Sequence, residues 1–135
     1  MLDIFRLSLA DQRDQIVFGE DYKSEKYGGG LRRFHELTIS QIDQLEEVGV
    51  IDKRDSQNDS PTAGEIIEFL RKRETDGWYV HGYCIGPDRN DFRITFEGVG
   101  KKTAPSQQDI IDFAMMFRFA DEFDISDDGV RCWYD

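Results

Sequence analysis

Two strand-like segments joined by a turn constrain the fold of this chain more than any other feature. Residues 77–86 (GWYVHGYCIG) and 92–100 (FRITFEGVG) are rich in aromatic and β-branched side chains, which favour β-strands. Between them lies PDRND, a combination of residue types that form turns. The sequence therefore predicts a β-hairpin over residues 77–100, with a connection of about five residues.

The second of these segments alternates between apolar and polar side chains. Successive side chains of a strand point to opposite faces of the sheet. One face is therefore predicted to be buried, and it carries Phe92, Ile94 and Phe96. The other face is predicted to contact water, and it carries Arg93, Thr95 and Glu97.

Helix-start signals occur three times outside the hairpin. In each of them, a Ser or Thr is followed three residues later by a side chain that can cap it in return, as in a capping box. The pairs are Thr38 with Gln41, Thr62 with Glu65, and Ser106 with Asp109. For the middle helix, Ser60 before Pro61 is an alternative start, because Pro is tolerated in the first helical turn. Gly49 is predicted to end the first of these helices. A helix with weaker periodicity is predicted within residues 1–18.

The helix predicted over residues 107–122 carries two apolar stripes on roughly opposite sides. One stripe consists of Ile110, Phe113, Ala114, Phe117 and Ala120. The second consists of Ile111, Met115, Phe119 and Phe123. A helix that is apolar nearly all round is buried on more than one side. We therefore expect it to lie between the sheet and other helices, or to contact another chain through the second stripe.

These segments together predict an α+β fold. Residues 129–134 alternate weakly and are expected to add a C-terminal strand to the hairpin 77–100, giving a small antiparallel sheet packed against three to four helices. Residues 1–30, which end in three glycines, are predicted to form an N-terminal arm and a Gly-rich hinge. Residues 31–135 are predicted to form a single domain.

Charge limits the classes of partner. The chain has 28 acidic and 17 basic residues, a net charge of −11 and a pI near 4.6. Nucleic acids and anionic membranes are bound by clustered Lys and Arg, which this chain lacks, so neither is an expected partner. A basic protein partner is better matched to this charge, although the charge could also serve solubility alone.

Three features of the sequence predict the cellular compartment: its apolar runs, its N-terminal residues and its number of cysteines. No apolar run approaches the ~20 residues of a membrane-spanning helix. The N-terminal residues, MLDIFRLSLADQRDQ, do not resemble a secretory signal. Two cysteines do not make a disulfide framework in a chain of 135 residues. We therefore expect a cytosolic protein with reduced thiols.

The last twelve residues, DISDDGVRCWYD, match part of a calcium-binding loop. Candidate ligands stand at positions one, three, five and twelve, with Gly129 at position six; they are Asp124, Ser126, Asp128 and Asp135. Arg131 stands where such loops carry an aliphatic residue, and the motif needs a second flanking helix. We therefore predict an acidic turn followed by a strand, and no resident metal or cofactor.

The sequence contains no established catalytic motif. Cys84 follows His81 by three residues, and in a strand this spacing points the two side chains to opposite faces. Cys84 and Cys132 are therefore predicted to be core residues rather than nucleophiles. A zinc site made of these three residues and His35 lacks the usual close ligand spacings.

The favoured hypothesis is a non-catalytic, acidic, cytosolic protein-binding module. A specific form of it is an immunity or antagonist protein that neutralises a basic partner. Exposed aromatic and acidic side chains would make the interface; the candidates are Trp78, Tyr79, Tyr83, Asp121, Asp127, Asp128 and Trp133.

Two alternatives remain open. The first is a small enzyme or ligand-binding protein with a pocket between the sheet and helix 107–122, for which His81, Tyr83 and Arg93 are the residues to mutate first. The second is a homo-oligomer formed through the second apolar stripe, so the chain is expected to be a monomer or a homodimer.

Overall fold

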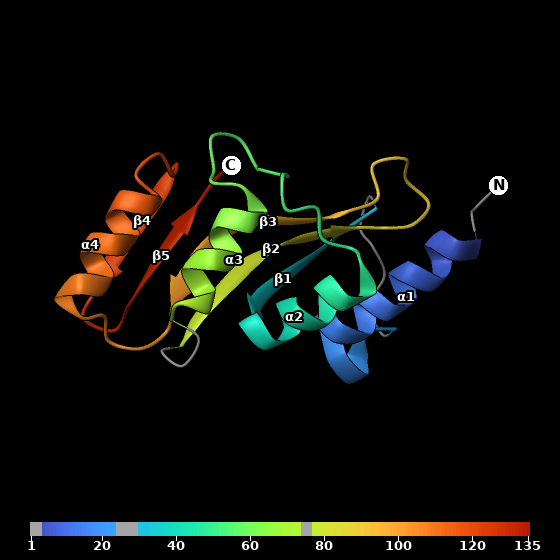
Figure 1. The fold of residues 1–135 in the computed structure, drawn as a ribbon, viewed down its shortest axis with the longest axis horizontal. Helices are drawn as coiled ribbons and strands as arrows, with labels where there is room; N and C mark the ends of the chain where they lie inside the picture. The colour runs from blue at the N-terminus through green and yellow to red at the C-terminus, as the bar shows by residue number, and fades with distance from the viewer. Residues whose placement is uncertain (1–3, 24–29, 74–76) are drawn as a thin grey trace.

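A five-stranded antiparallel sheet forms the centre of the protein (Figure 1). The computed structural model describes residues 4–23, 30–73 and 77–135. The spatial order of the strands is β1-β2-β3-β5-β4, so that β1 and β4 are the two edges. Their bounds are β1 Leu31–Leu37, β2 Trp78–Ile85, β3 Ile94–Lys101, β4 Glu122–Ser126 and β5 Gly129–Trp133.

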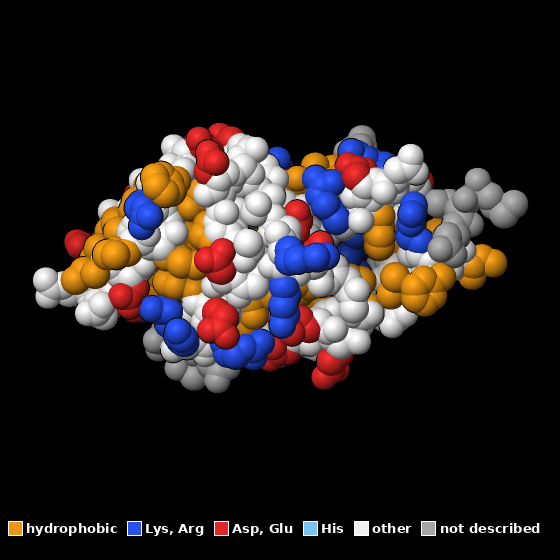
Figure 2. Space-filling view, turned by 45° about the horizontal axis from the view of Figure 1, so that its top comes forward, with side chains coloured by type: hydrophobic (Ala, Val, Ile, Leu, Met, Phe, Trp, Pro, Cys, Tyr) orange, Lys and Arg blue, Asp and Glu red, His pale blue; other side chains and the backbone are white. Residues whose placement is uncertain are grey.

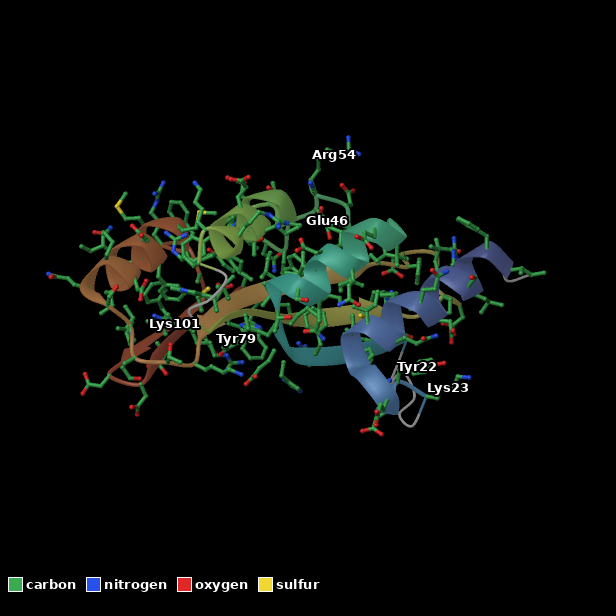
Figure 3. The ribbon with its side chains drawn as sticks, turned by 60° about the horizontal axis from the view of Figure 1, so that its bottom comes forward. Tyr22, Lys23, Glu46, Arg54, Tyr79 and Lys101 are labelled. Carbon is green, nitrogen blue, oxygen red and sulfur yellow. The ribbon has the colours of Figure 1, made fainter. Side chains whose placement is uncertain are left out.

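Helices cover one face of this sheet. The helices in the described residues are α1 Ile4–Phe18, α2 Ile39–Val48, α3 Ala63–Arg71 and α4 Gln107–Met116, with a short 3₁₀ turn, η1, at Gly19–Asp21. In Figures 1 and 3, α2, α3 and α4 lie along the same side of the sheet. The core lies between these three helices and the sheet, where Ile42, Leu70, Phe113, Val80 and Val99 are almost completely buried.

The predicted capping boxes set the starts of three helices. The Thr38 and Thr62 side chains cap α2 and α3, and Gln41 and Glu65 return the bond to the backbone of the capping residue. Ser106 and Asp109 do the same for α4. α2 ends at Gly49, whose φ of 87° is the left-handed conformation that glycine adopts most easily. The capping pairs and Gly49 were therefore correct predictors of these helix ends, whereas the alternative start at Ser60 was wrong, because α3 begins after Thr62.

The α+β class, the hairpin and the added C-terminal strand are confirmed, but the sheet has two strands more than predicted. β1 pairs with β2, with Arg33 opposite Tyr83. β4 lies at the opposite edge and pairs with β5, with Asp124 opposite Arg131. Both strands are short or irregular, and β1 contains a register shift between Phe34 and Leu37 that disrupts its alternation.

The end of helix 107–122 was predicted wrongly. α4 ends at Met116, and residues 122–126 form β4 instead of a last helical turn. The segment Glu122–Ser126 alternates charged and apolar side chains, which is the pattern of a strand rather than of a helix. Phe123 therefore reaches the core side from a strand, where its ring lies 4.8 Å from that of Phe113.

The solvent-exposed face predicted for β3 is also wrong. Thr95 and Glu97 are only 2% and 4% exposed. Long side chains lie over them, because Arg33 of β1 pairs with Glu97, and Arg93, directly before β3, hydrogen-bonds to Thr95. Both faces of β3 are thus buried, one by helices and the other by side chains of the sheet itself.

The N-terminal helix packs against the rest of the chain. Arg13 is fully buried and donates hydrogen bonds from Nη1 to the carbonyl oxygens of Ile85 and Arg93, at 2.9 and 3.1 Å. The hinge predicted before residue 31 falls mainly on residues 24–29, which lie outside the described part of the chain. None of the helices in the described ranges has the length and apolar character of a membrane span.

Candidate functional site: the outer face of the sheet and the C-terminal hairpin

The face of the sheet opposite α2, α3 and α4 carries a layer of aromatic and charged side chains, which we call the outer face. Alternation along β2 places Trp78, Val80 and Cys84 in the core, so the residues between them point to the outer face. The outer face consists of Arg33, Tyr79, His81, Tyr83, Glu97, Arg131 and Trp133. Figure 3 labels Tyr79 on the side of the sheet away from these helices.

Two glycines of β3 let rings lie close to the strand. A Cβ atom at Gly98 would lie 2.4 Å from Nε2 of His81, and one at Gly100 would lie 2.4 Å from the Tyr79 ring. Any side chain at these positions would therefore displace the aromatic residue above it. The alternation of glycines and rings makes a closely packed surface at the centre of the outer face.

Ionic and hydrogen-bonding contacts connect the rest of the outer face. Arg33 forms an ion pair with the buried Glu97, and its guanidinium carbon lies 6.0 and 5.8 Å from the ring centroids of Tyr83 and Trp133. Arg93 donates from Nη2 to the Tyr83 hydroxyl at 3.0 Å. These polar groups are thus already engaged with one another, which favours a structural layer over a reactive site.

His81 is poorly suited to act as a base at neutral pH. Burial lowers its pKa to about 4, so the ring is neutral at pH 7. Its Nε2 atom lies 2.8 Å from the carbonyl oxygen of Cys132, which can only accept a hydrogen bond. We therefore assign the tautomer with the proton on Nε2, and this proton is held by the backbone.

Acidic side chains gather on the hairpin formed by β4 and β5. Glu122, Asp124, Asp127 and Asp128 are all exposed. None of the four forms an ion pair with another described residue. Arg131 lies opposite Asp124 in the register, but its guanidinium carbon lies 4.7 Å from the Trp133 ring centroid. The hairpin therefore presents uncompensated negative charge.

Exposed apolar side chains lie at the same end of the molecule. We call them the C-terminal patch: Ile111, Met115, Phe119, Phe123 and Ile125. Met115 and Phe119 are each 65% exposed, although both are large apolar residues. Figure 2 shows apolar side chains gathered over α4. The second apolar stripe predicted for this helix is thus at the surface rather than between the helix and the rest of the core.

The predicted interface residues do not all share one surface. Trp78 is in the core, where its ring contacts Phe69 and Phe113. Tyr79, Tyr83 and Trp133 share the outer face, although Tyr83 is only 8% exposed. The predicted acidic residues, Asp121, Asp127 and Asp128, lie on the C-terminal hairpin or directly before it.

One ion pair and one strand of this region were not predicted from the sequence. The ion pair between Arg33 and Glu97 was not predicted. Nothing in the sequence shows that two residues 64 positions apart lie near each other. The strand β4 could have been found from the alternation of acidic and apolar residues at 122–125, followed by Asp127, Asp128 and Gly129 at the turn.

The calcium-loop candidates are spread along the hairpin. Asp128 lies at the turn next to the pair Ser126–Gly129, whereas Asp135 follows the pair Glu122–Trp133 at the other end. Four residue steps of about 3.4 Å separate those pairs by roughly 14 Å, whereas ligands of one calcium ion lie within about 5 Å of each other. Among the described residues, no group of three or more His, Cys, Asp or Glu side chains could hold a metal ion.

The space between the sheet and α4 is filled by aromatic rings. Phe113 and Phe117 are fully buried, and the Phe113 ring contacts that of Trp78. A hollow lined by Arg93 does exist, but it lies beside α1 and the end of α2, with Arg13 and Asp52 in its wall. Cys84 and Cys132 are free, buried thiols, as predicted, and burial raises the pKa of each to about 12.

No protein-family model, curated protein or solved structure gives a significant match to this chain.

Proposed function

We propose that this chain is a non-catalytic, cytosolic binding module that docks a basic protein partner through its C-terminal end. An immunity or antagonist protein, which masks a basic surface on its target, is the specific form that we favour. The observation that carries the proposal is the combination of the C-terminal patch with the unpaired carboxylates of the adjoining hairpin.

Exposed apolar area supports a docking role for this end. Large apolar side chains gathered on one surface commonly mark interaction sites in soluble proteins. Phe119 and Met115 retain most of their surface in contact with water, so their burial in a complex would contribute favourable free energy. Aromatic residues and Met are also enriched where protein interfaces are most buried.

The charge of the hairpin supports a basic partner. From Asp121 to Asp135 there are six acidic residues, at 121, 122, 124, 127, 128 and 135, and one basic residue, Arg131. Complementary charges around an apolar centre accelerate association and exclude partners of like charge. The partner is therefore expected to present Lys or Arg around an apolar contact.

Matched baits test this proposal. The wild-type chain, Phe119→Ala, the double variant Asp127→Asn/Asp128→Asn, and Phe5→Ala are each used to capture proteins from the source cell. Phe5 is 69% exposed on α1, so its substitution removes a comparable aromatic surface far from the C-terminal end. Captured proteins are identified by mass spectrometry, and the purified pair is then measured by calorimetry at low and high salt.

The expected result is a basic partner that is retained by Phe5→Ala and weakened by both C-terminal variants. Its affinity should fall as the salt concentration rises, because salt screens exposed charges. The proposal is wrong if the partner is acidic, if its affinity does not change with salt, or if the C-terminal variants bind as well as the wild type.

The enzyme or small-ligand alternative has weaker support. Its first candidate residues, His81, Tyr83 and Arg93, are engaged by hydrogen bonds within the protein. The hollow beside Arg93 is open to a ligand, but its arginines are already bonded to backbone and side-chain oxygens. The side chains that would form the interface of a binding module are exposed instead.

A further inference from the structure

β4 is a sheet edge with unusual exposure. It is the last strand in the order β1-β2-β3-β5-β4, so one of its sides has no neighbouring strand within the described sheet. All five of its residues are exposed, which holds for no other described strand. An edge strand leaves alternate backbone N–H and C=O groups free to pair with another extended segment.

The two faces of β4 differ in chemistry. Phe123 lies on the side of α4, where its ring contacts Phe113, and Ile125 follows on the same face. Glu122 and Asp124 point to the outer face. A strand added beside β4 would place its own side chains next to both rows, because directly opposed residues lie about 5 Å apart. The edge would therefore select a segment that alternates between apolar and basic residues.

The same charges oppose pairing between two copies of this chain. In a β4–β4 pair the carboxylates of Glu122 and Asp124 would meet those of the second copy, and like charges placed directly opposite are destabilising. Asp127 and Asp128 at the turn would add to the repulsion. The acidic row thus protects the edge against self-association and leaves it open to a strand of opposite charge.

We propose that the partner binds by β-strand addition: an extended segment with alternating apolar and Lys or Arg residues pairs with β4 and extends the sheet. This inference rests on the proposed function and specifies its partner. The backbone of β4 would supply directional hydrogen bonds, Phe123 and Ile125 would contact the apolar row, and Glu122 and Asp124 would contact the basic row.

A synthetic peptide of eight residues that alternates Lys and Val serves as the probe. A second peptide of the same composition, with four Lys followed by four Val, keeps the charge but loses the alternation. Binding is measured by calorimetry, and amide hydrogen exchange is measured residue by residue with and without peptide. We expect the alternating peptide to slow exchange at β4 by about tenfold at saturation, while amides of α2 keep their rates.

Charge variants test the acidic row. Glu122→Gln/Asp124→Asn should weaken the alternating peptide about fivefold, because each cross-strand pair contributes a few tenths to one kcal/mol. The matched control, Glu47→Gln/Glu68→Gln, makes the same charge change on exposed positions of α2 and α3 and should leave the affinity within about twofold. Circular dichroism of both variants checks that the fold is retained.

Three results would overturn the inference. The first is that the alternating peptide does not bind at millimolar concentration. The second is that a basic partner or peptide binds without protecting β4 amides; this leaves the proposed function intact and rejects only strand addition. The third is that the protein alone sediments as a dimer with protected β4 amides, which would make a second copy the occupant.

Discussion

The ion pair between Lys101 and Asp109 should be a main determinant of stability at the C-terminal end. Nζ of Lys101 lies 2.6 Å from Oδ2 of Asp109, and their side chains are only 7% and 15% exposed. The same carboxylate accepts a hydrogen bond from the backbone N–H of Ser106 at 2.9 Å and so completes the cap of α4. Asp109 thus joins the helix start to the central strand β3.

The cost of Asp109→Ala follows from these two roles. Losing the capping contact costs about 1 kcal/mol. Breaking a buried ion pair costs about 3–5 kcal/mol when the remaining charge has no partner. Because Asp109 keeps some contact with water and Lys101 keeps a weak bond to the carbonyl of Ala104, we take a total of about 3 kcal/mol. With about 2.1 cal/mol/K of unfolding entropy per residue, this lowers Tm by roughly 10 °C.

Urea and thermal unfolding of three variants, measured beside the wild type, test the role of this ion pair. In Lys101→Met/Asp109→Ala, the lysine charge that Asp109→Ala leaves unpaired is replaced by an apolar side chain. This double variant should therefore cost only about 1 kcal/mol. Glu47→Ala, at an exposed position of α2, serves as the control and should cost less than about 0.5 kcal/mol. A main role of the ion pair in stability is refuted if Asp109→Ala costs less than about 1 kcal/mol, or if the double variant is less stable than Asp109→Ala.

Two further predictions concern the core and the outer face. Phe113→Ala should lower the free energy of unfolding by about 3–5 kcal/mol, because it leaves a cavity among fully buried rings. Phe119→Ala, at an exposed position, should change this free energy by less than about 0.5 kcal/mol. Equal losses of the two variants in urea unfolding would contradict the observed packing. Burial lowers the pKa of His81 to about 4, so the unfolded chain binds more protons than the folded one between about pH 6.5 and 4, and stability should fall as the pH drops through this range. His81→Asn should lose part of this dependence in unfolding measured between pH 4 and 7, and an unchanged pH profile would show that His81 does not cause it.

Local sequence signals predicted the elements that depend on neighbouring residues. The capping boxes at Thr38, Thr62 and Ser106 located three helix starts, because a cap needs only a side chain and the backbone three residues later. The hairpin of β2 and β3 was predicted for the same reason, since its strands are joined by a turn. Burial of Cys84 was predicted because free cysteine is among the residue types most often found in cores, and Cys84 is buried.

Signals that competed with one another gave the errors. Phe119 and Phe123 fit a helical spacing from Ile111, although residues 122–126 also fit the alternation of a strand. The helical spacing is lost at Phe117, where the φ of −113° and ψ of 27° leave the helical range. By contrast, the acidic turn and strand predicted in place of a calcium loop at residues 124–135 are present, with Asp127 and Asp128 at the turn and β5 after it.

The sequence alone determined the α+β class, the helix starts and the surplus of negative charge, since these depend on local patterns and on composition. The tertiary structure decided which surfaces these residues form. It brought Arg33 from one strand to Glu97 of another, buried the polar face of β3, and left β4 at an edge with its acidic and apolar rows exposed. Such pairings join residues distant in the chain, and only the packing of the helices and the order of the strands specify them.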